Sequence, residues 1–135
     1  MDEKQKELAI YRYHIAIETW DTANGLFQHG RFRDAINRSY YASFYGVRSL
    51  YALLGRDFRK HKTLLGNFNK EFVATGIFPR NFGKSLSALA YVREQNDYDD
   101  FFLADRDTCE KQLQFARELL EAIKKYIQEK YDILL

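Results

Sequence analysis

Residues 37–48 read Asn-Arg-Ser-Tyr-Tyr-Ala-Ser-Phe-Tyr-Gly-Val-Arg, and this stretch decides the fold. Its aromatic residues occupy two neighbouring stripes of a helix: Tyr40, Tyr41, Phe44 and Tyr45. A helix that buries a single face needs a narrower apolar stripe than this. We therefore expect the helix to have two partners, which are the core of its own domain and a second surface outside it.

The same periodicity extends along the chain. Apolar residues recur at steps of three and four, the spacing of a helix face, in five segments. The segments cover about Asp2 to Phe27, Phe32 to Leu54, His61 to Ala74, the residues from Pro79 towards Arg93, and a last stretch to Ile127 that Asp105 or Asp107 could cap. On the first segment the expected face consists of Ile10, Tyr13, Ile17, Trp20, Asn24 and Phe27.

Breaks separate these segments. Glycines and the single proline fall between them, and the acidic, aromatic residues from Asn96 to Ala104 indicate a loop. No segment alternates with the period of two that marks a strand. The sequence therefore predicts an all-α, up-and-down helical bundle of four to five helices, three of them long, in a single domain over residues 1–135.

Composition limits the class of protein. The chain has 135 residues and one cysteine, Cys109, which excludes a disulfide within the chain and favours the reducing cytoplasm. The charged start lacks the apolar core of a signal peptide, and no apolar run approaches the roughly 20 residues that cross a bilayer. The net charge of +2 is too small to indicate nucleic-acid binding by itself.

Three blocks of sequence resemble HEPN domains (higher eukaryotes and prokaryotes nucleotide-binding) between about Ile10 and Ile127. Residues 30–42 are similar to the G-x-x-x-x-A-x-x-x-x-Y-Y-A start of that family's second helix. Lys60-His61-Lys62, with Phe68 and Phe72-Val73 after it, looks like the family's His-containing turn and third helix. Residues 93–99, Arg-Glu-Gln-Asn-Asp-Tyr-Asp, resemble the R-x-x-x-D-Y-D signature of a prokaryotic subgroup.

This resemblance implies a homodimer of small helical bundles. Such proteins are often encoded beside a minimal nucleotidyltransferase, in toxin–antitoxin or related defence pairs. Many members of the family are metal-independent endoribonucleases. Their motif is an Arg followed, after four to six intervening residues, by a His at the dimer cleft.

The chain departs from that ribonuclease motif. After Arg93 the His would stand at one of positions 98–100, which hold Tyr98 and two aspartates. Tyrosine titrates near pH 10 and an ionised Asp cannot act as an acid, so neither replaces an imidazole. The histidines of the chain are His14, His29 and His61, none of them near Arg93 in sequence.

The sequence therefore favours a homodimeric interaction or binding module over an enzyme. Its expected partner protein is a minimal nucleotidyltransferase, and its expected ligand is a nucleotide or RNA. The alternative is a divergent metal-independent endoribonuclease that uses Arg93 with Tyr98 or His61. No His, Cys and carboxylate cluster has metal-ligand spacing, and we expect neither a metal nor a cofactor.

Arg93 and Asp97 are four residues apart, so they share one face of a helix. One interpretation is a local ion pair that ends the fourth helix. The other is an Arg aimed at a phosphate, with Asp97 and Tyr98 fixing its rotamer, because the guanidinium suits planar recognition of phosphate.

Two further groups have two interpretations each. Lys60, His61 and Lys62 belong to the most basic segment of the chain, which either contacts an RNA backbone or forms the solvated start of the third helix. On the second helix, one side carries residue types that are enriched at interfaces and also pack in cores: Tyr41, Tyr45 and Arg48. These three are the expected dimer interface.

Overall fold

The computed structural model describes residues 2–135, and most of these residues are helical. The elements are α1 (Glu3–Gln28), α2 (Phe32–Leu53), α3 (His61–Phe68), the π-helix η1 (Asn69–Val73), α4 (Arg80–Tyr98) and α5 (Arg106–Tyr131). No strand occurs among the described residues. The prediction of an all-α helical bundle is confirmed. None of the helices in this part of the chain is long and apolar enough to cross a membrane.

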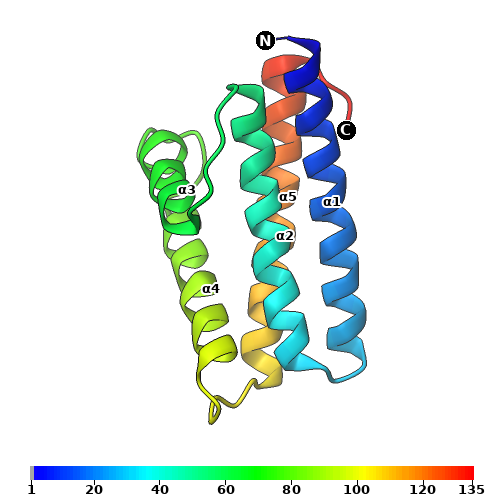
Figure 1. The fold of residues 1–135 in the computed structure, drawn as a ribbon, viewed down its shortest axis with the longest axis vertical. Helices are drawn as coiled ribbons and strands as arrows, with labels where there is room; N and C mark the ends of the chain where they lie inside the picture. The colour runs from blue at the N-terminus through cyan, green and yellow to red at the C-terminus, as the bar shows by residue number, and fades with distance from the viewer. Residues whose placement is uncertain (1) are drawn as a thin grey trace.

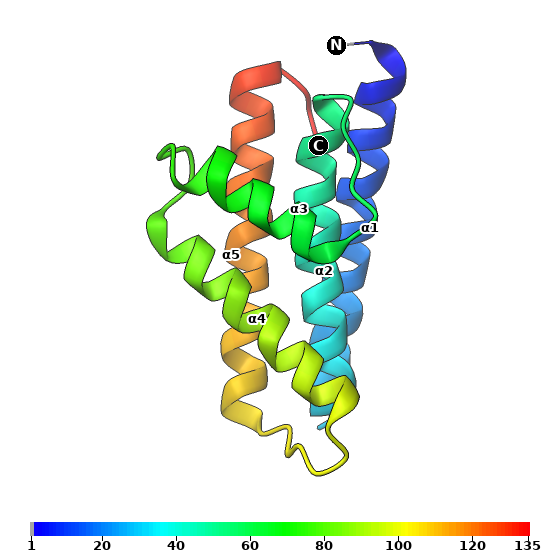
Figure 2. The same cartoon turned by 60° about the vertical axis from the view of Figure 1, so that its left-hand side comes forward.

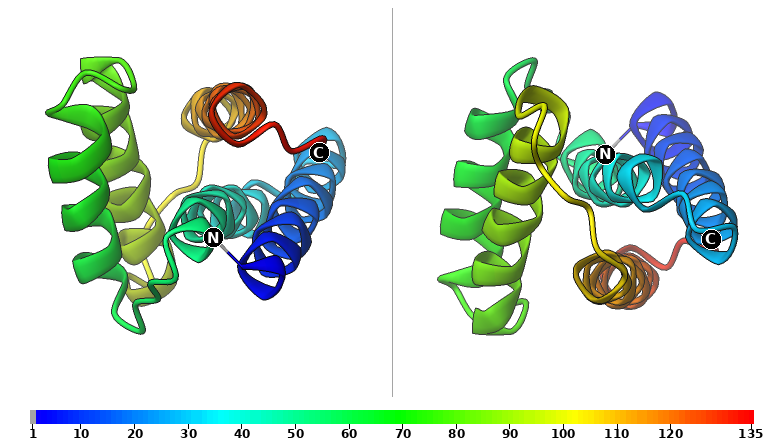
Figure 3. Two further views of the ribbon diagram at one scale, coloured as in Figure 1. Left: turned by 90° about the horizontal axis from the view of Figure 1, so that it is seen from above. Right: turned by 90° about the horizontal axis from the view of Figure 1, so that it is seen from below.

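The second helix lies at the centre of the bundle. Helices α1, α2 and α5 run side by side along the long axis (Figure 1), and α3 and α4 cross obliquely over one side (Figure 2). Seen from above, α2 lies between α1 and the α3–α4 pair (Figure 3). It contacts α1, α3, α4 and α5. Contacts within one chain therefore explain why the apolar surface of α2 is wide. The expected second surface outside the domain is not needed to explain that width.

Small residues lie on the buried face of α1. The expected face of α1 is shifted, because its most deeply buried positions include Ala9, Ala16 and Ala23, whereas Ile17 is 38% exposed. Alanine lets two helices approach closely. Towards α5, the Tyr13 hydroxyl of α1 donates to the Leu120 carbonyl at 2.8 Å, and the Trp20 indole donates to the Leu113 carbonyl at 2.9 Å. These two bonds tie α1 to α5.

Local signals set most of the helix ends. Asp2 forms a capping box with Gln5 at the start of α1. Asp105 caps α5, because its carboxylate accepts from the Thr108 amide at 2.7 Å. Gly55, with φ of 67°, follows α2 in the left-handed region that favours glycine. These ends agree with the predicted segments.

The end of α4 was predicted wrongly. The helix continues through Asn96 to Tyr98, where the sequence indicated a loop. Asn96 is 1% exposed, and its amide donates to the Arg33 carbonyl at 2.8 Å, while the Arg33 guanidinium donates back to the Asn96 carbonyl. This pair of bonds anchors the last turn of α4 to the first turn of α2.

The third predicted segment divides into α3 and η1. The π-helical turn is closed by a bond from the Ala74 amide to the Asn69 carbonyl at 2.8 Å. The turn to α4 then buries Phe78, whose ring lies between 5.6 and 6.0 Å from four neighbouring aromatic rings, those of Phe68, Phe72, Phe82 and Tyr126. This aromatic cluster holds α3 and α4 against α5.

Candidate functional site

Arg93 lies on α4 and faces the aromatic surface of α2. Its Nη1 donates to Asp97 Oδ2 at 3.1 Å, so the predicted local pair is formed. Its Cζ lies 4.6 Å from the centroid of the Tyr40 ring and 5.8 Å from that of Tyr41. The side chain is only 16% exposed, and its buried Nε has no hydrogen-bond partner within residues 2–135. Arg93 is therefore held in place and keeps a donor unused.

His61 is the first residue of α3 and meets the same aromatic surface. Its Nδ1 is hydrogen-bonded to the Tyr40 hydroxyl at 2.7 Å. Its ring centroid lies 4.0 Å from that of Phe44 and 5.6 Å from that of Tyr40. Tyr40 thus contacts His61 through its hydroxyl and Arg93 through its ring face. The spacing of His61 and Arg93 in the sequence does not predict that they lie on one surface.

These contacts set the charges of the site. Burial lowers the pKa of His61 below its ordinary value of 6.5, and the charges of Arg93 and Arg48 lower it further. Burial raises the pKa of Tyr40 to about 12. Burial alone would lower the pKa of Arg93, but its hydrogen bond to Asp97 contributes to a net rise. Near pH 7 the surface therefore carries a neutral imidazole, a protonated phenol and a cationic guanidinium.

Asn37 and Arg38 extend the site along α2. Arg38 donates to Asn37 Oδ1 from Nη2 at 2.7 Å and from Nε at 3.0 Å, and its Cζ lies 5.0 Å from the Tyr41 ring centroid. Asn37 Nδ2 lies 3.4 Å from each oxygen of Asp97. We call the following residues the Arg93 cluster: Asn37, Arg38, Tyr40, Tyr41, His61, Arg93 and Asp97.

The other expected site residues lie around this cluster. Tyr98 is 77% exposed and makes no hydrogen bond to Arg93 within the described residues, so Asp97 holds Arg93 without it. Lys60 and Lys62 flank His61 and are exposed. Neither forms an ion pair in the part of the chain described.

The expected interface residues are partly covered. Tyr41 and Tyr45 are half-buried neighbours, with ring centroids 6.4 Å apart. Arg48 donates to Asp57 at 3.0 Å, and Asp57 also pairs with Arg12 of α1 at 3.1 Å. These ion pairs pin the loop after α2 onto the bundle, so Arg48 has a role within the chain. The dimer interface stays a prediction.

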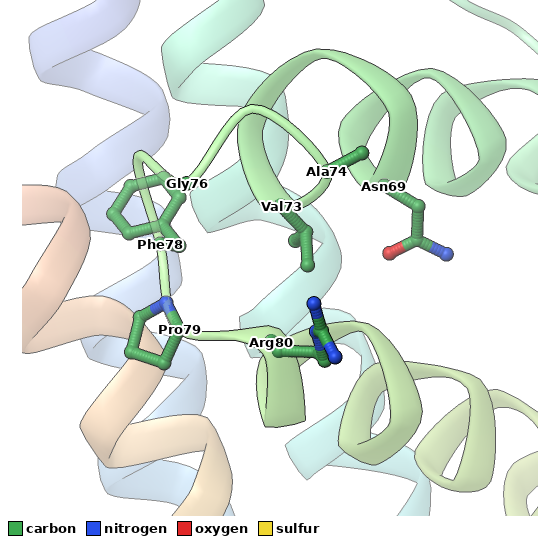
Figure 4. Close-up of a pocket in the computed structure, with 7 residues that line it drawn as sticks. All are labelled: Asn69, Val73, Ala74, Gly76, Phe78, Pro79 and Arg80. Atoms are coloured by element: carbon green, nitrogen blue, oxygen red, sulfur yellow. The ribbon is translucent and has the colours of Figure 1, made fainter.

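A separate pocket lies between η1 and the start of α4, where Asn69, Val73 and Arg80 are among the lining residues (Figure 4). It contains none of the candidate catalytic, binding or interface residues that the sequence predicted. Elsewhere, Cys109 is buried, and burial raises the pKa of its thiol to about 11. Within residues 2–135 no group of three or more His, Cys or carboxylate side chains could hold a metal ion.

The Arg93 cluster has two chemical capacities. Guanidinium groups lying on aromatic rings suit a ligand that has phosphate and planar bases. A neutral imidazole can accept a proton near pH 7.

The sequence did not identify Tyr40 as a site residue. A tyrosine on the predicted core stripe nevertheless indicates a buried hydroxyl that needs a hydrogen-bond partner.

Comparison with known proteins places the chain among relatives. The sequence profile of HEPN domains matches residues 10–126. A "UPF0332 protein" of Thermotoga maritima is 34% identical over 96% of this chain and 97% of its own length. Two proteins of Methanocaldococcus jannaschii have more distant similarity. "Putative toxin MJ0605" is 28% identical over 85% of each chain, and "Putative toxin MJ0142" is 25% identical over 85% of this chain and 78% of its own. The profile match and the Thermotoga relative span most of the sequence, so the chain belongs to the HEPN domain family.

Proposed function

We propose that this HEPN chain is a homodimeric binding module of a toxin–antitoxin-type pair and that it binds RNA or a nucleotide through the Arg93 cluster. The observation that carries the proposal is the placement of Arg93. Its guanidinium lies over Tyr40 and Tyr41 and is oriented by Asp97. Relatives named as toxins support the biological context.

A phosphate is the ligand group that fits this arrangement. Arg presents a rigid fork of donors, and a fixed guanidinium loses little side-chain entropy on binding. Arg38, over the Tyr41 ring at 5.0 Å, supplies a second cation close by. The exposed Lys60 and Lys62 can extend the contact along an RNA backbone.

The partner protein in this proposal is a minimal nucleotidyltransferase, as in other HEPN pairs, and both act in the cytoplasm. The two copies of the homodimer meet through the half-buried Tyr41 and Tyr45 together with Arg48. Co-purification of the chain with a nucleotidyltransferase encoded beside it tests this pairing. Recovery of the chain without that protein, when both are expressed together, would exclude a stable complex.

A titration of labelled single-stranded RNA tests the ligand. Arg93→Ala should weaken binding about tenfold or more, because it removes a fixed phosphate contact. Arg117→Ala is the matched control, since Arg117 also pairs with a carboxylate four residues on, Glu121 at 3.0 Å, and lies over a ring, Trp20 at 4.7 Å. Equal affinities of the two variants would refute the proposed site.

A second candidate function is a metal-independent endoribonuclease, and the hydrogen bond between Tyr40 and His61 favours it. That bond brings a neutral imidazole onto the surface that holds Arg93. With Nδ1–H donating to the Tyr40 oxygen, Nε2 of the imidazole could take the proton of a 2′-hydroxyl as the 2′-oxygen bonds to phosphorus. The bond to the 5′-oxygen breaks, and that oxygen takes a proton from water. In this reaction Arg93 would stabilise the charge on the phosphate.

Cleavage of RNA in EDTA separates the two functions. If the chain is a binding module, the wild type leaves the RNA intact. If it is an enzyme, Arg93→Ala and His61→Ala both abolish cleavage. The products would then carry a 2′,3′-cyclic phosphate and a 5′-hydroxyl. Tyr98→Phe tests the other residue that could replace the missing His. Cleavage by the wild type that survives Arg93→Ala would contradict both assignments.

A further inference from the structure

A polar pocket adjoins the Arg93 cluster. It lies between the first turns of α2 and the last turn of α4, and it is lined by Arg33, Asp34, Asn37, Asn96 and Asp97. Asn37 and Asp97 belong to both places, because Asp97 pairs with Arg93 at 3.1 Å and both its oxygens lie 3.4 Å from Asn37 Nδ2. The pocket and the Arg93 cluster therefore share a border.

One of the lining residues, Asn96, has an unpaired acceptor that is buried behind the pocket surface. The Asn96 side chain is almost wholly buried, and its Nδ2 donates to the Arg33 carbonyl at 2.8 Å. That bond identifies which atom of the side-chain amide is the nitrogen, so the remaining terminal atom is the acceptor Oδ1. Asn96 Oδ1 has no hydrogen-bond partner within residues 2–135. Buried polar atoms in folded proteins are normally paired, so a donor is missing from the protein's own contacts.

A second unpaired acceptor is the carboxylate of Asp34. It is exposed and forms no ion pair or side-chain hydrogen bond in the described part of the chain, whereas Asp97 is already engaged by Arg93. The two carboxylates outnumber the one cationic side chain of the lining, Arg33, so the pocket itself disfavours a phosphate, which offers only acceptors. The group that fits must present hydrogen-bond donors.

Among the four RNA bases, guanine meets this requirement best. Its N1–H and N2–H₂ are adjacent donors on one edge, and together they match the two oxygens of a carboxylate. Adenine and cytosine each present one amino group beside a ring acceptor, and uracil presents a single N–H between two carbonyls. None of these three bases presents two adjacent donors to the Asp34 carboxylate.

We infer that this pocket is a guanine-selective subsite, in which Asp34 accepts from N1–H and N2–H₂ of the base while Arg93 and Arg38 bind the phosphate of the same nucleotide. The inference rests on the proposed function, because it names the base preference of that same site. Asp34 is then a specificity-determining residue, and Asn37 and Asp97 form the border between the base and phosphate positions.

Calorimetric titration with the four nucleoside 5′-monophosphates tests the inference. GMP should bind about tenfold or more tightly than AMP, CMP and UMP, the discrimination expected of one bidentate contact. IMP, which lacks the N2 amino group, should bind more weakly than GMP. Asp34→Asn should remove most of the GMP preference. Asp107→Asn should retain it, and it is a matched control because Asp107 is likewise an exposed acid in the first turn of a helix, α5.

The outcomes separate this inference from the proposed function. Equal binding of all four nucleotides, weakened throughout by Arg93→Ala, would overturn the guanine subsite and leave the phosphate site standing. An unchanged GMP preference in Asp34→Asn would also overturn the subsite. Binding of none of the nucleotides by the wild type would overturn the subsite, and failure to bind RNA as well would remove the proposed function with it.

Discussion

Tyr40 connects the two chemical groups of the site. Its position in the core stripe of α2 follows from the sequence, and a buried tyrosine hydroxyl needs a partner. The partner is His61, which α3 brings across α2, while Arg93 covers the ring from α4. The pair of Arg93 and Asp97 could be predicted from spacing alone. The meeting of His61 with Arg93 could not, because it depends on how two distant helices cross a third.

The lowered pKa of His61 makes stability depend on pH. The pKa of His61 is 6.5 in the unfolded chain and lower in the folded chain. At pH values between these two pKa values, the unfolded chain binds more protons than the folded chain. The free energy of unfolding therefore falls as the pH falls through this window. The urea midpoint should drop as the pH falls below about 6.5, and the drop should be smaller in His61→Gln.

His14→Gln is the control for this measurement, since His14 is exposed on α1. That variant should retain the pH dependence of the wild type. If the midpoint of His61→Gln fell with pH as much as that of the wild type, another group would be responsible. The account of how His61 is buried would then be wrong.

At the scale of elements, periodicity and capping residues predicted the five helical segments, because these signals are local. The end of α4 was predicted wrongly because Asn96 is held in the helix by hydrogen bonds to Arg33, a residue that is distant in sequence. The buried face of α1 differs from the predicted one because three of its most buried residues are alanines, which carry a weak hydrophobic signal. The division of the third segment into α3 and η1 had no recognised signal in the sequence.

Two glycines inside helices should respond oppositely to replacement by alanine. A Cβ on Gly46 of α2 would lie 2.5 Å from Leu120 Cδ2 and 3.3 Å from Ile123 Cδ1 of α5, which is overpacking that typically costs about 1–3 kcal/mol. A Cβ on Gly25 of α1 would meet nothing within 4 Å, and the gain in helix propensity is up to about 1 kcal/mol.

Thermal unfolding should therefore give a lower midpoint for Gly46→Ala than for the wild type and a higher one for Gly25→Ala. Because the propensity gain also applies at position 46, the loss there should be about 0–2 kcal/mol. A Gly46→Ala protein as stable as Gly25→Ala would show that α2 and α5 are not packed this closely.

At the scale of the whole molecule, the central position of α2 changes the argument for a dimer. Contacts with four other helices cover most of its apolar surface, so the proposal rests on family membership and on the half-buried Tyr41 and Tyr45. Light scattering at micromolar concentration should give about twice the mass of one chain. Tyr41→Glu or Tyr45→Glu should weaken the dimer more than Lys124→Glu, which changes an exposed residue of α5. The mass of a single chain would contradict the dimer.

The salt dependence of RNA binding tests the central claim most directly, because it reports the phosphate contacts of Arg93. For a single strand, the slope of log K against log salt changes by about 0.7 for each phosphate contact. We expect Arg93→Ala to make the slope shallower by about that amount, while Arg117→Ala keeps the slope of the wild type. Equal slopes for the wild type and both variants would contradict the assignment of Arg93 as the phosphate-binding residue.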